Sequence, residues 1–517
     1  MSKLFIGHKP GVGGVVKVMA NNADDALATP NTDYGKFLFN SETGEIAHLD
    51  HWEYAGWDGS ASVGALTFYP GGSGPDECFK VISRSGGGGD LQTVWVYPNR
   101  IINRSYPVIA ESRRAYPLGT EIEGPAARYW QTAEDEFGGR GGYNRAWMTY
   151  VTDLRSGIDG GHNYAEPVAM RLWPDKRRGS SIDYFRSDTT PSLFTVMDLP
   201  CYTQSIPAVP AGAPGTRNTL ISPTLVRVGR GGVDADTVGR DGLIIDSTRV
   251  PMKVVRAGEV VVAASGSSDV LTPVELTDRT YMDYMVWRDG QALTIPQAIT
   301  NDSIGDQFFK MSYVIYGDRV RIFNRGSQTL RVRYMICADD GRTTSGGVQV
   351  FRNLPSGHQQ LKRPGSSDAN PLSGDILLDT RFAYPSIVSS GYLHQDAFVE
   401  SATSQAYGDR AKTVSFANPG DFYPFVKYYV RRQGGANGQV TEPWAAVLKS
   451  GISGIQKDIQ CSDGTVALVT DTSVKFHLAL GHPYRYRLDE GQIVPDHSND
   501  DKPIGIHYYI FAIPKNL

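Results

Sequence analysis

The chain has 517 residues, including 57 glycines and 30 prolines, and a formal net charge of −4. This length is too great for one hydrophobic core, and the glycine and proline content favours strands and turns over a helical protein. A slightly acidic chain without long basic or apolar runs gives no reason to expect nucleic-acid binding or membrane insertion. We also expect no export signal, because residues 1–7 contain no apolar core.

The first predicted domain is an N-terminal β domain covering residues 1–205. Strand-like runs at 65–69 and 146–151 are separated by clusters of glycine, which suit hairpin tips and loops. The alternation of apolar and polar residues fades between 105 and 142. This predicts a loop-rich insertion near 105–142, with a short helix around 126–136.

A Pro/Gly-rich linker is predicted at 206–239. Residues 206–215 consist almost entirely of proline, alanine, glycine and valine, so they lack the backbone donors and large apolar groups that a sheet needs. A second linker, rich in glycine, serine and proline, is predicted at 346–373. These two linkers divide the chain into three domains.

The second predicted domain is a β-sandwich at 240–345. Arginine alternates with apolar residues at 319–323 and again at 330–334. One face of each strand should therefore be buried, while Arg331 and Arg333 should face solvent or an interface.

The third predicted domain is a β-sandwich at 374–517. It contains an aromatic run at 423–430, which corresponds to 281–287 of the second domain, and a hairpin at 466–478. Short strands and long glycine-rich loops without a strand–helix–strand rhythm indicate antiparallel sandwiches.

A repeated motif links the three domains. Each copy is a glycine, a short apolar run and then Asn or Asp followed by Ser or Thr, at residues 35–41, 242–249 and 374–381. Such residues suit a strand that ends in a turn closed by side-chain hydrogen bonds. Since 330–338 also resembles 506–512, whole domains appear duplicated. The predicted fold is all-β: tandem antiparallel β-sandwiches of jelly-roll or immunoglobulin type, with long loops and little helix.

Several residues were considered as chemical sites. His48, Asp50 and His51 could bind a metal, but a strand would place the two histidines on opposite faces and no third ligand is evident. The acidic run at 134–136 could serve glycoside hydrolysis, although consecutive acids more often face water. The glycine clusters lack the Lys-Ser/Thr of a phosphate loop.

Other features have a structural explanation as well as a functional one. Trp52, Trp57 and Trp130 could stack on sugars, or fill cores and interfaces. The basic run at 176–178 suits a solvated turn, and the two Tyr-Gly-Asp-Arg segments at 316–319 and 407–410 suit hairpins. We therefore assign no catalytic, cofactor-binding or metal-binding residue, expect no cofactor and no enzyme activity, and leave the partner-binding residues unassigned.

The four cysteines are Cys78, Cys201, Cys337 and Cys461. Their spacing fits neither a zinc site nor a redox pair. Buried, reduced thiols are one interpretation, and interchain disulfides between copies in an assembly are the other.

The opening of the chain carries a resemblance to a known class of proteins. Residues 9–12 (KPGV) and 32–42 (TDYGKFLFNSE) resemble the start of virion structural proteins of tailed bacteriophages, and the aromatic strand, hairpin and final Tyr-x-Ile pattern of the third domain is similar to β repeats in that class. The long insertion and the length of the chain depart from the pattern. The resemblance leaves the position on the virion open among tail, collar, fibre and capsid decoration.

This resemblance implies a non-enzymatic structural component of the virion, assembled in the host cytoplasm. Its expected partners are copies of itself, as a trimer or a ring, and neck, tail or capsid proteins. The alternative is a receptor-binding or glycan-binding fibre or spike protein, with or without glycan-cleaving activity, whose partner is a host surface glycan.

Overall fold

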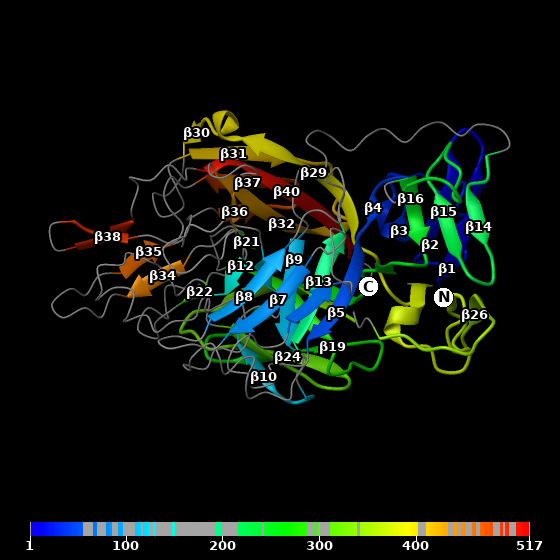
Figure 1. The fold of residues 1–517 in the computed structure, drawn as a ribbon, viewed down its shortest axis with the longest axis horizontal. Coiled ribbons are helices and arrows are strands. Elements are labelled where there is room, and N and C mark those ends of the chain that lie inside the picture. The colour runs from blue at the N-terminus through cyan, green and yellow to red at the C-terminus, as the bar shows by residue number, and fades with distance from the viewer. Residues whose placement is uncertain are drawn as a thin grey trace.

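The computed structural model describes residues 2–54, 117–123, 216–239, 242–287, 311–338, 342–401, 410–432, 466–478, 503–515 and 517, together with short strands between them (Figure 1). The predicted all-β class is confirmed, since the strands form several antiparallel sheets. The helices that lie wholly in the described part of the chain are 3-10 turns of three residues each: η1 (Tyr34–Lys36), η6 (Ser373–Asp375) and η7 (Gln395–Ala397). The helix predicted around 126–136 is wrong at Arg128–Trp130, which forms strand β11 and pairs with a neighbouring strand.

The chain contains three repeats, 2–198, 216–338 and 342–515, which we call repeats 1, 2 and 3. Each begins with a small three-stranded antiparallel sheet, here called a head sheet. The head sheets are β1-β2-β3 (Lys3–Lys9, Gly13–Met19, Phe37–Asn40), β14-β15-β16 (Thr219–Ile221, Val226–Gly229, Leu243–Asp246) and β26-β27-β28 (Phe351–Asn353, Gln359–Lys362, Ile376–Asp379). In Figure 1 the three head sheets gather at one end of the molecule, which we call the head.

The head sheets share an irregularity as well as an order. The register shifts at a β-bulge near the end of each middle strand, at Val18/Met19, Val228/Gly229 and Leu361/Lys362. The third strand of each head sheet is the apolar run of the repeated sequence motif. The two strands before it belong to the same unit, so the repeat starts earlier than its motif.

Because repeats 2 and 3 begin before their motifs, some of their strands lie in the two segments predicted to be linkers. Strands β14 and β15 lie within 206–239, and β26 and β27 lie within 346–373. Residues 206–215, the most proline-rich part, lie outside the described residues. The division of the chain into three separately folding domains stays a prediction.

Repeats 2 and 3 continue into sandwiches with the same strand order. In repeat 2 one sheet is β18-β25-β20 (Val254–Val262, Leu330–Cys337, Tyr281–Trp287) and the other is β19-β24-β23 (Ser267–Leu271, Arg319–Asn324, Met311–Ile315). In repeat 3 the equivalents are β29-β40-β32 (Ser386–His394, Pro503–Pro514, Phe422–Arg432) and β31-β37-β36 (Arg410–Ser415, Ser473–Leu478, Val466–Val469). Consecutive strands mostly alternate between the two sheets, as in jelly rolls rather than immunoglobulin domains.

Aromatic side chains join the two sheets of each sandwich. The ring centroids of Tyr284 and Tyr313 are 6.4 Å apart in repeat 2, and those of Tyr428 and Phe476 are 5.3 Å apart in repeat 3. All four side chains are buried. Edge-to-face aromatic pairs of this kind add to the free energy of burying the rings.

Repeat 1 shares the first sheet of this plan. Its order β9-β13-β5 (Ile109–Arg114, Ser192–Asp198, His48–Tyr54) again places the last strand of the repeat in the middle. Its second sheet is β12-β8-β7-β6 (Trp147–Thr149, Leu91–Val96, Phe79–Arg84, Leu66–Tyr69). Repeat 3 also contains the shorter strands β30 (Glu400–Ser401), β33 (Gln439–Thr441), β35 (Asp458–Cys461), β38 (Tyr486–Asp489) and β39 (Gln492–Pro495).

Neighbouring repeats complete each other's sheets. Strand β10 (Glu121–Glu123) of repeat 1 pairs with β23 of repeat 2, and β21 (Leu293–Thr294) of repeat 2 pairs with β36 of repeat 3. Strand β22 (Ala298–Ile299) of repeat 2 also pairs, in parallel, with β34 (Ala446–Lys449) of repeat 3. Because β21 also pairs with β20, the strands β18-β25-β20 of repeat 2 and β36-β37-β31 of repeat 3 are parts of one eight-stranded sheet.

The predicted alternation in the second domain holds for β24, which alternates between buried and half-buried residues. In β25, Arg331 is half-buried, whereas Arg333 is only 6% exposed. Of the two predicted environments, solvent or an interface, Arg333 has the second, because its guanidinium binds Asp471 of repeat 3 as well as Glu259 of its own repeat.

Candidate functional site

The repeated sequence motif forms the same turn three times. In each copy the Asn or Asp side-chain oxygen accepts a hydrogen bond from the backbone N–H two residues later: Asn40 from Glu42 at 3.0 Å, Asp246 from Thr248 at 2.9 Å and Asp379 from Arg381 at 2.9 Å. Short polar side chains of this type stabilise a turn by taking the place of a backbone acceptor.

The next residue ties each turn to the middle strand of its head sheet. Its hydroxyl oxygen accepts a backbone N–H, and its own N–H donates to the carbonyl of the same strand residue. The pairs are Ser41 with Val16, Ser247 with Val226 and Thr380 with Gln359, each with an N–H···O distance to the hydroxyl of 3.0 Å. The local prediction of a capped strand end is confirmed in all three copies.

The segments that leave these turns bind one another in a closed cycle. Strand β17 (Val250–Pro251) of repeat 2 pairs with β5 of repeat 1, and β29 of repeat 3 pairs with β4 (Glu45–Ile46) of repeat 1. Val254 of repeat 2 and Ala383 of repeat 3 exchange backbone hydrogen bonds of 2.9 and 3.0 Å. Each repeat therefore contacts both others, so the chain builds a threefold-like ring by itself.

The head of repeat 1 contains a buried polar cluster. Lys17 lies in the middle of β2 and is fully buried, yet its ammonium is 2.7 Å from a carboxylate oxygen of Glu42 and 3.0 Å from the side-chain oxygen of Asn31. Lys9 binds the same carboxylate at 2.8 Å. Burial raises the pKa of Glu42, but hydrogen bonds from Lys17, Lys9 and Asn31 together lower that pKa below its usual value.

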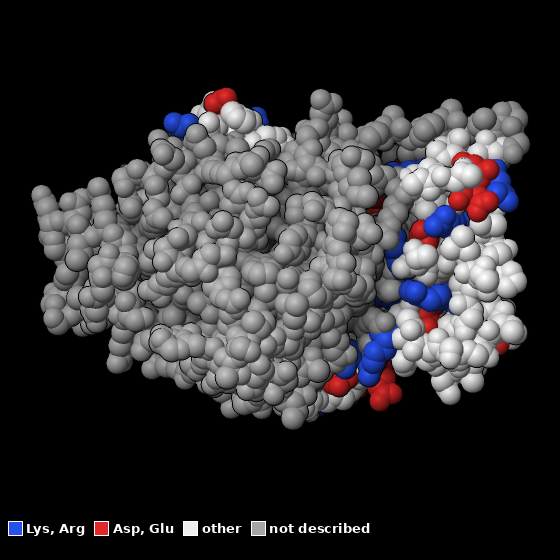
Figure 2. All heavy atoms as spheres, viewed as in Figure 1, with Lys and Arg blue, Asp and Glu red and all other residues white. Residues whose placement is uncertain are grey.

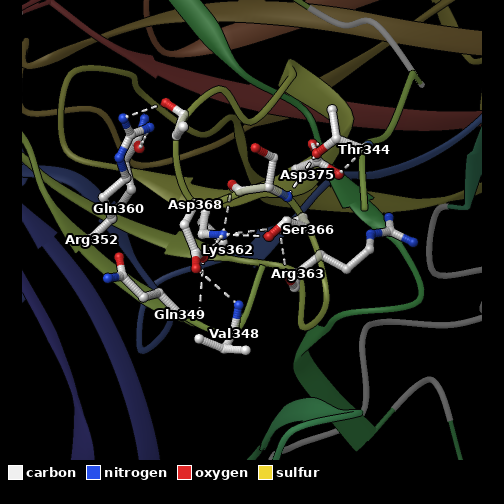
Figure 3. A network of polar contacts seen from close by, with 12 residues as sticks. Thr344, Val348, Gln349, Arg352, Gln360, Lys362, Arg363, Ser366, Asp368 and Asp375 are labelled. Atoms are coloured by element: carbon white, nitrogen blue, oxygen red, sulfur yellow. Dashed lines mark hydrogen bonds and ion pairs between the residues drawn. The ribbon is translucent and has the colours of Figure 1, made fainter. Parts of the chain in front are cut away.

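The head of repeat 3 is organised around two aspartates (Figure 3). Asp368 accepts the backbone N–H groups of Val348 and Gln349, both at 3.0 Å, and the ammonium of the buried Lys362, also at 3.0 Å. The Val348 N–H, then Lys362 and the Gln349 N–H, lower the pKa of Asp368 to about 2. The carboxylate thus joins the irregular segment preceding β26 to the loop after β27.

The second aspartate, Asp375, holds the first residues of repeat 3. It is fully buried and accepts the backbone N–H groups of Thr344 and Leu372 and the Thr344 hydroxyl, at distances of 2.6 to 3.1 Å. Asp368 and Asp375 therefore both position backbone.

Contacts between repeats are also polar. In the head, His8 and Asn218 are 3.0 Å apart, Leu4 donates its N–H to Gln359 at 3.0 Å, and Arg230 pairs with Glu45. Residues of all three repeats take part. The order of the repeats around the ring is therefore specified by unlike side chains at the junctions.

Two ion pairs join the sandwiches of repeats 2 and 3. Asp283 and Lys427 occupy the same position in β20 and β32, and their side chains meet at 3.1 Å with Lys427 only 2% exposed. Arg333 lies 2.6 Å from Glu259 and 3.0 Å from Asp471 of repeat 3. Opposite charges at equivalent positions favour pairing of unlike repeats over pairing of like ones.

The exposed surface of the head is mixed in character. Acidic and basic side chains are interspersed over the described surface (Figure 2), as with Arg217, which lies 2.7 Å from Asp236. Each of the three repeats also has exposed apolar side chains in the head: Leu27 at 42%, Ile221 at 43%, Phe351 at 52% and Val348 at 87% exposure. This surface suits contacts with other proteins better than it suits binding of one strongly charged ligand.

The structure separates the histidines considered from the sequence. His48 is buried at the start of β5, and His51 lies three residues further along the same strand. Trp52 lies on β5 and Trp130 on β11. Their side chains, with those of Asp50 and His51, and all of Trp57, 134–136 and 176–178 lie outside the described residues.

The remaining candidates divide in the same way. The segment 316–319 forms the predicted hairpin turn, in which the Tyr316 N–H donates to the Arg319 carbonyl at 2.8 Å. The second copy lies outside the described residues up to Arg410, which begins β31. Cys337 is buried and forms no disulfide within the described part of the chain. Cys461 ends β35, while Cys78 and Cys201 are outside the described residues, so the disulfide question stays open for these three.

Sequence reasoning missed the polar clusters of the head. One signal was present: Lys17 interrupts an otherwise apolar strand, and an Asp-Ala pair recurs after the second strand of each head sheet, at 25–26, 234–235 and 368–369. A charge inside a buried strand needs a partner, which the loop supplies.

Among the described side chains, no group of three or more His, Cys, Asp or Glu residues is placed to hold a metal ion. In the same part of the chain, no helix is long and apolar enough to cross a membrane. Comparison with protein-family models, curated proteins and solved structures gives no match to this chain.

Proposed function

We propose that this chain is a non-enzymatic structural component of a tailed-bacteriophage particle, where it binds copies of itself and neck, tail or capsid proteins. It would assemble in the host cytoplasm and remain in the virion. The position on the particle, whether tail, collar, fibre or capsid decoration, is left open by this proposal.

The observation that supports the proposal is the closed cycle of three repeats. Each repeat pairs its exit segment with the other two through backbone hydrogen bonds, at Pro251 with His48, Val254 with Ala383 and Ser386 with Ile46. One chain thereby acquires the form that many assemblies obtain from three subunits. Such a body suits attachment at a symmetric position of a particle.

A second support comes from how the chain uses its charged groups. Asp368 and Asp375 bind backbone N–H groups, and Arg333 and Lys427 bind carboxylates at junctions of repeats. These groups stiffen the head and the repeat interfaces. Together with the phage-like opening at 9–12 and 32–42, this use of charge favours a load-carrying role over a catalytic one.

Purified phage particles provide the test. Peptides of this chain should be found in them by mass spectrometry at a fixed copy number, and antibodies against it should label one location in electron micrographs. Absence from particles that are intact and infectious would contradict the proposal. Specific binding or cleavage of host glycans by the purified chain would instead favour the fibre or spike function.

A further inference from the structure

The buried cluster of repeat 1 has the parts needed to form a covalent bond. We propose that Lys17 and Asn31 become joined by an intramolecular amide bond between the lysine Nζ and the side-chain carbon of the asparagine, with Glu42 as the proton carrier. The product is an isopeptide crosslink that ties β2 to the loop between β2 and β3.

The nucleophile and its target are already in contact. Lys17 Nζ is 3.0 Å from Asn31 Oδ1, so the carbonyl carbon is within reach of a small rotation of either side chain. Groups held together in this way react as though at very high concentration. Lys17 is fully buried, and the Phe37 ring lies over its ammonium at 5.2 Å. The amine is therefore held in place and shielded from solvent next to its target.

Glu42 lies where a proton carrier is required. Its Oε2 is 2.7 Å from Lys17 Nζ, and the nearby Asn31 side chain helps to lower the pKa of the carboxylate. The carboxylate is thus bonded to the nitrogen that must lose protons, and that nitrogen is itself bonded to the amide whose nitrogen must leave. Positioned proton transfer of this kind accelerates acyl chemistry substantially.

A third side chain polarises the carbonyl. Asn40, which is 3% exposed, donates its Nδ2 to the same Asn31 Oδ1 at 3.0 Å. A fixed donor at this oxygen stabilises the negative charge that develops on it when the carbon is attacked. Asn40 is therefore a positioning residue of the repeated turn that also serves this step.

The reaction balances without any added reagent. Lys17 transfers a proton to Glu42, and the free amine attacks the side-chain carbon of Asn31, forming the Nζ–C bond. The C–Nδ2 bond then breaks, and the leaving nitrogen takes one proton from Nζ and one from Glu42. The products are a neutral secondary amide, an ammonium ion and the original Glu42 carboxylate.

Repeat 3 contains a natural comparison. Lys362 is equally buried and contacts Asp368 at 3.0 Å, but its other contacts are the backbone oxygens of Ser366 and Ser367 and the Ser366 hydroxyl. None of these groups is a second carboxyl that could carry the proton. We therefore expect a bond at Lys17 and none at Lys362.

Mass spectrometry of the denatured full chain tests the proposal. Formation of the bond releases ammonia, so the mass should be about 17 Da below that of the sequence. Trypsin should fail to cut after Lys17, and a further cut before Asp24 should leave two peptides that stay linked. An unmodified chain in which trypsin cuts after Lys17 overturns the proposal. So does a loss of ammonia confined to one unbranched peptide, because that indicates a cyclised asparagine.

Variants separate the roles of the side chains. Asn31→Ala and Glu42→Gln should both retain the full mass of the chain. In Glu42→Gln, Lys17 and Asn31 are both present, so the missing bond would be due to loss of the proton carrier. Lys9→Ala is the matched control, since the Lys9 ammonium binds the same carboxylate at 2.8 Å through hydrogen bonds to Glu42, and this variant should keep the crosslink. Retention of the crosslink in Glu42→Gln would overturn the role of Glu42. A variant that fails to fold would also keep its full mass. The mass of the denatured wild-type chain does not depend on any variant, so this measurement decides by itself whether the bond forms.

Discussion

The hydroxyl that closes the repeat 2 turn can be removed with little other change. In wild-type protein Ser247 Oγ accepts the backbone N–H of Val226 at 3.0 Å, and the two residues are 4% and 0% exposed. Ser247→Ala removes the acceptor and leaves no room for water to replace it. The reciprocal bond from the Ser247 N–H to the Val226 carbonyl, at 2.9 Å, remains.

The expected cost follows from the burial of the N–H. A buried donor without an acceptor costs about 1 to 3 kcal/mol. Opening of this turn should therefore become about 5 to 150 times more frequent, since a factor of ten corresponds to about 1.4 kcal/mol. Ser247→Thr should restore most of the stability, because repeat 3 has Thr380 at the equivalent position with the same bond.

Hydrogen exchange at the Val226 amide, followed by mass spectrometry on short peptides, measures this opening, and urea unfolding measures the global effect. Ser268→Ala is the control, since its exposed hydroxyl donates to the Val261 carbonyl at 3.2 Å and its loss should change stability by less than about 0.5 kcal/mol. Unchanged exchange at Val226 in Ser247→Ala would refute the structural role assigned to the repeated hydroxyl.

Three further results are expected. Gly13→Ala should weaken the contact between repeats 1 and 2, because the added methyl would lie 2.3 Å from the Gly231 Cα, whereas Gly11→Ala has the same kind of positive φ but no atom within 4 Å; a similar loss of thermal stability in both would show that the clash is unimportant. The lowered pKa of Asp368 should stabilise the repeat 3 head above the carboxyl's unfolded pKa of about 4, and this contribution should disappear as the pH falls towards 2; Asp368→Asn should remove that acid dependence in urea unfolding measured against pH. Cleavage within 206–215 should leave both fragments associated in native gel filtration, because β10 pairs with β23 and β4 with β29, and separation of the fragments without denaturant would contradict this.

Local features of the fold could be predicted from the sequence because they depend on neighbouring residues. The apolar runs before Asn40, Asp246 and Asp379 form strands, and the polar residues after them form turns, since side-chain hydrogen bonds there reach only a few positions along the chain. The likeness of 330–338 to 506–512 also has a structural counterpart, because β25 and β40 are the central strands of equivalent sheets.

Features that depend on distant residues could not be predicted in this way. Arg333 follows the period of an exposed face, but it is buried because Asp471, on another repeat, supplies a carboxylate. Strands β14, β15, β26 and β27 are only three or four residues long, and the segments around them are rich in glycine and polar residues. Composition alone therefore predicts linkers at these positions. The candidate site was missed for the same reason, since Lys17 finds Asn31 and Glu42 only after the loop folds back.

The closed cycle of repeats can form only after the third repeat has been synthesised. The N–H of Leu4 binds Gln359, a residue 355 positions later in the chain. At a translation rate of about 5 to 20 residues per second, the first head sheet waits about 20 to 70 s before that partner leaves the ribosome. During this interval its edges are open to other chains on the same messenger, so correct closure depends on the early sheets remaining soluble until repeat 3 arrives.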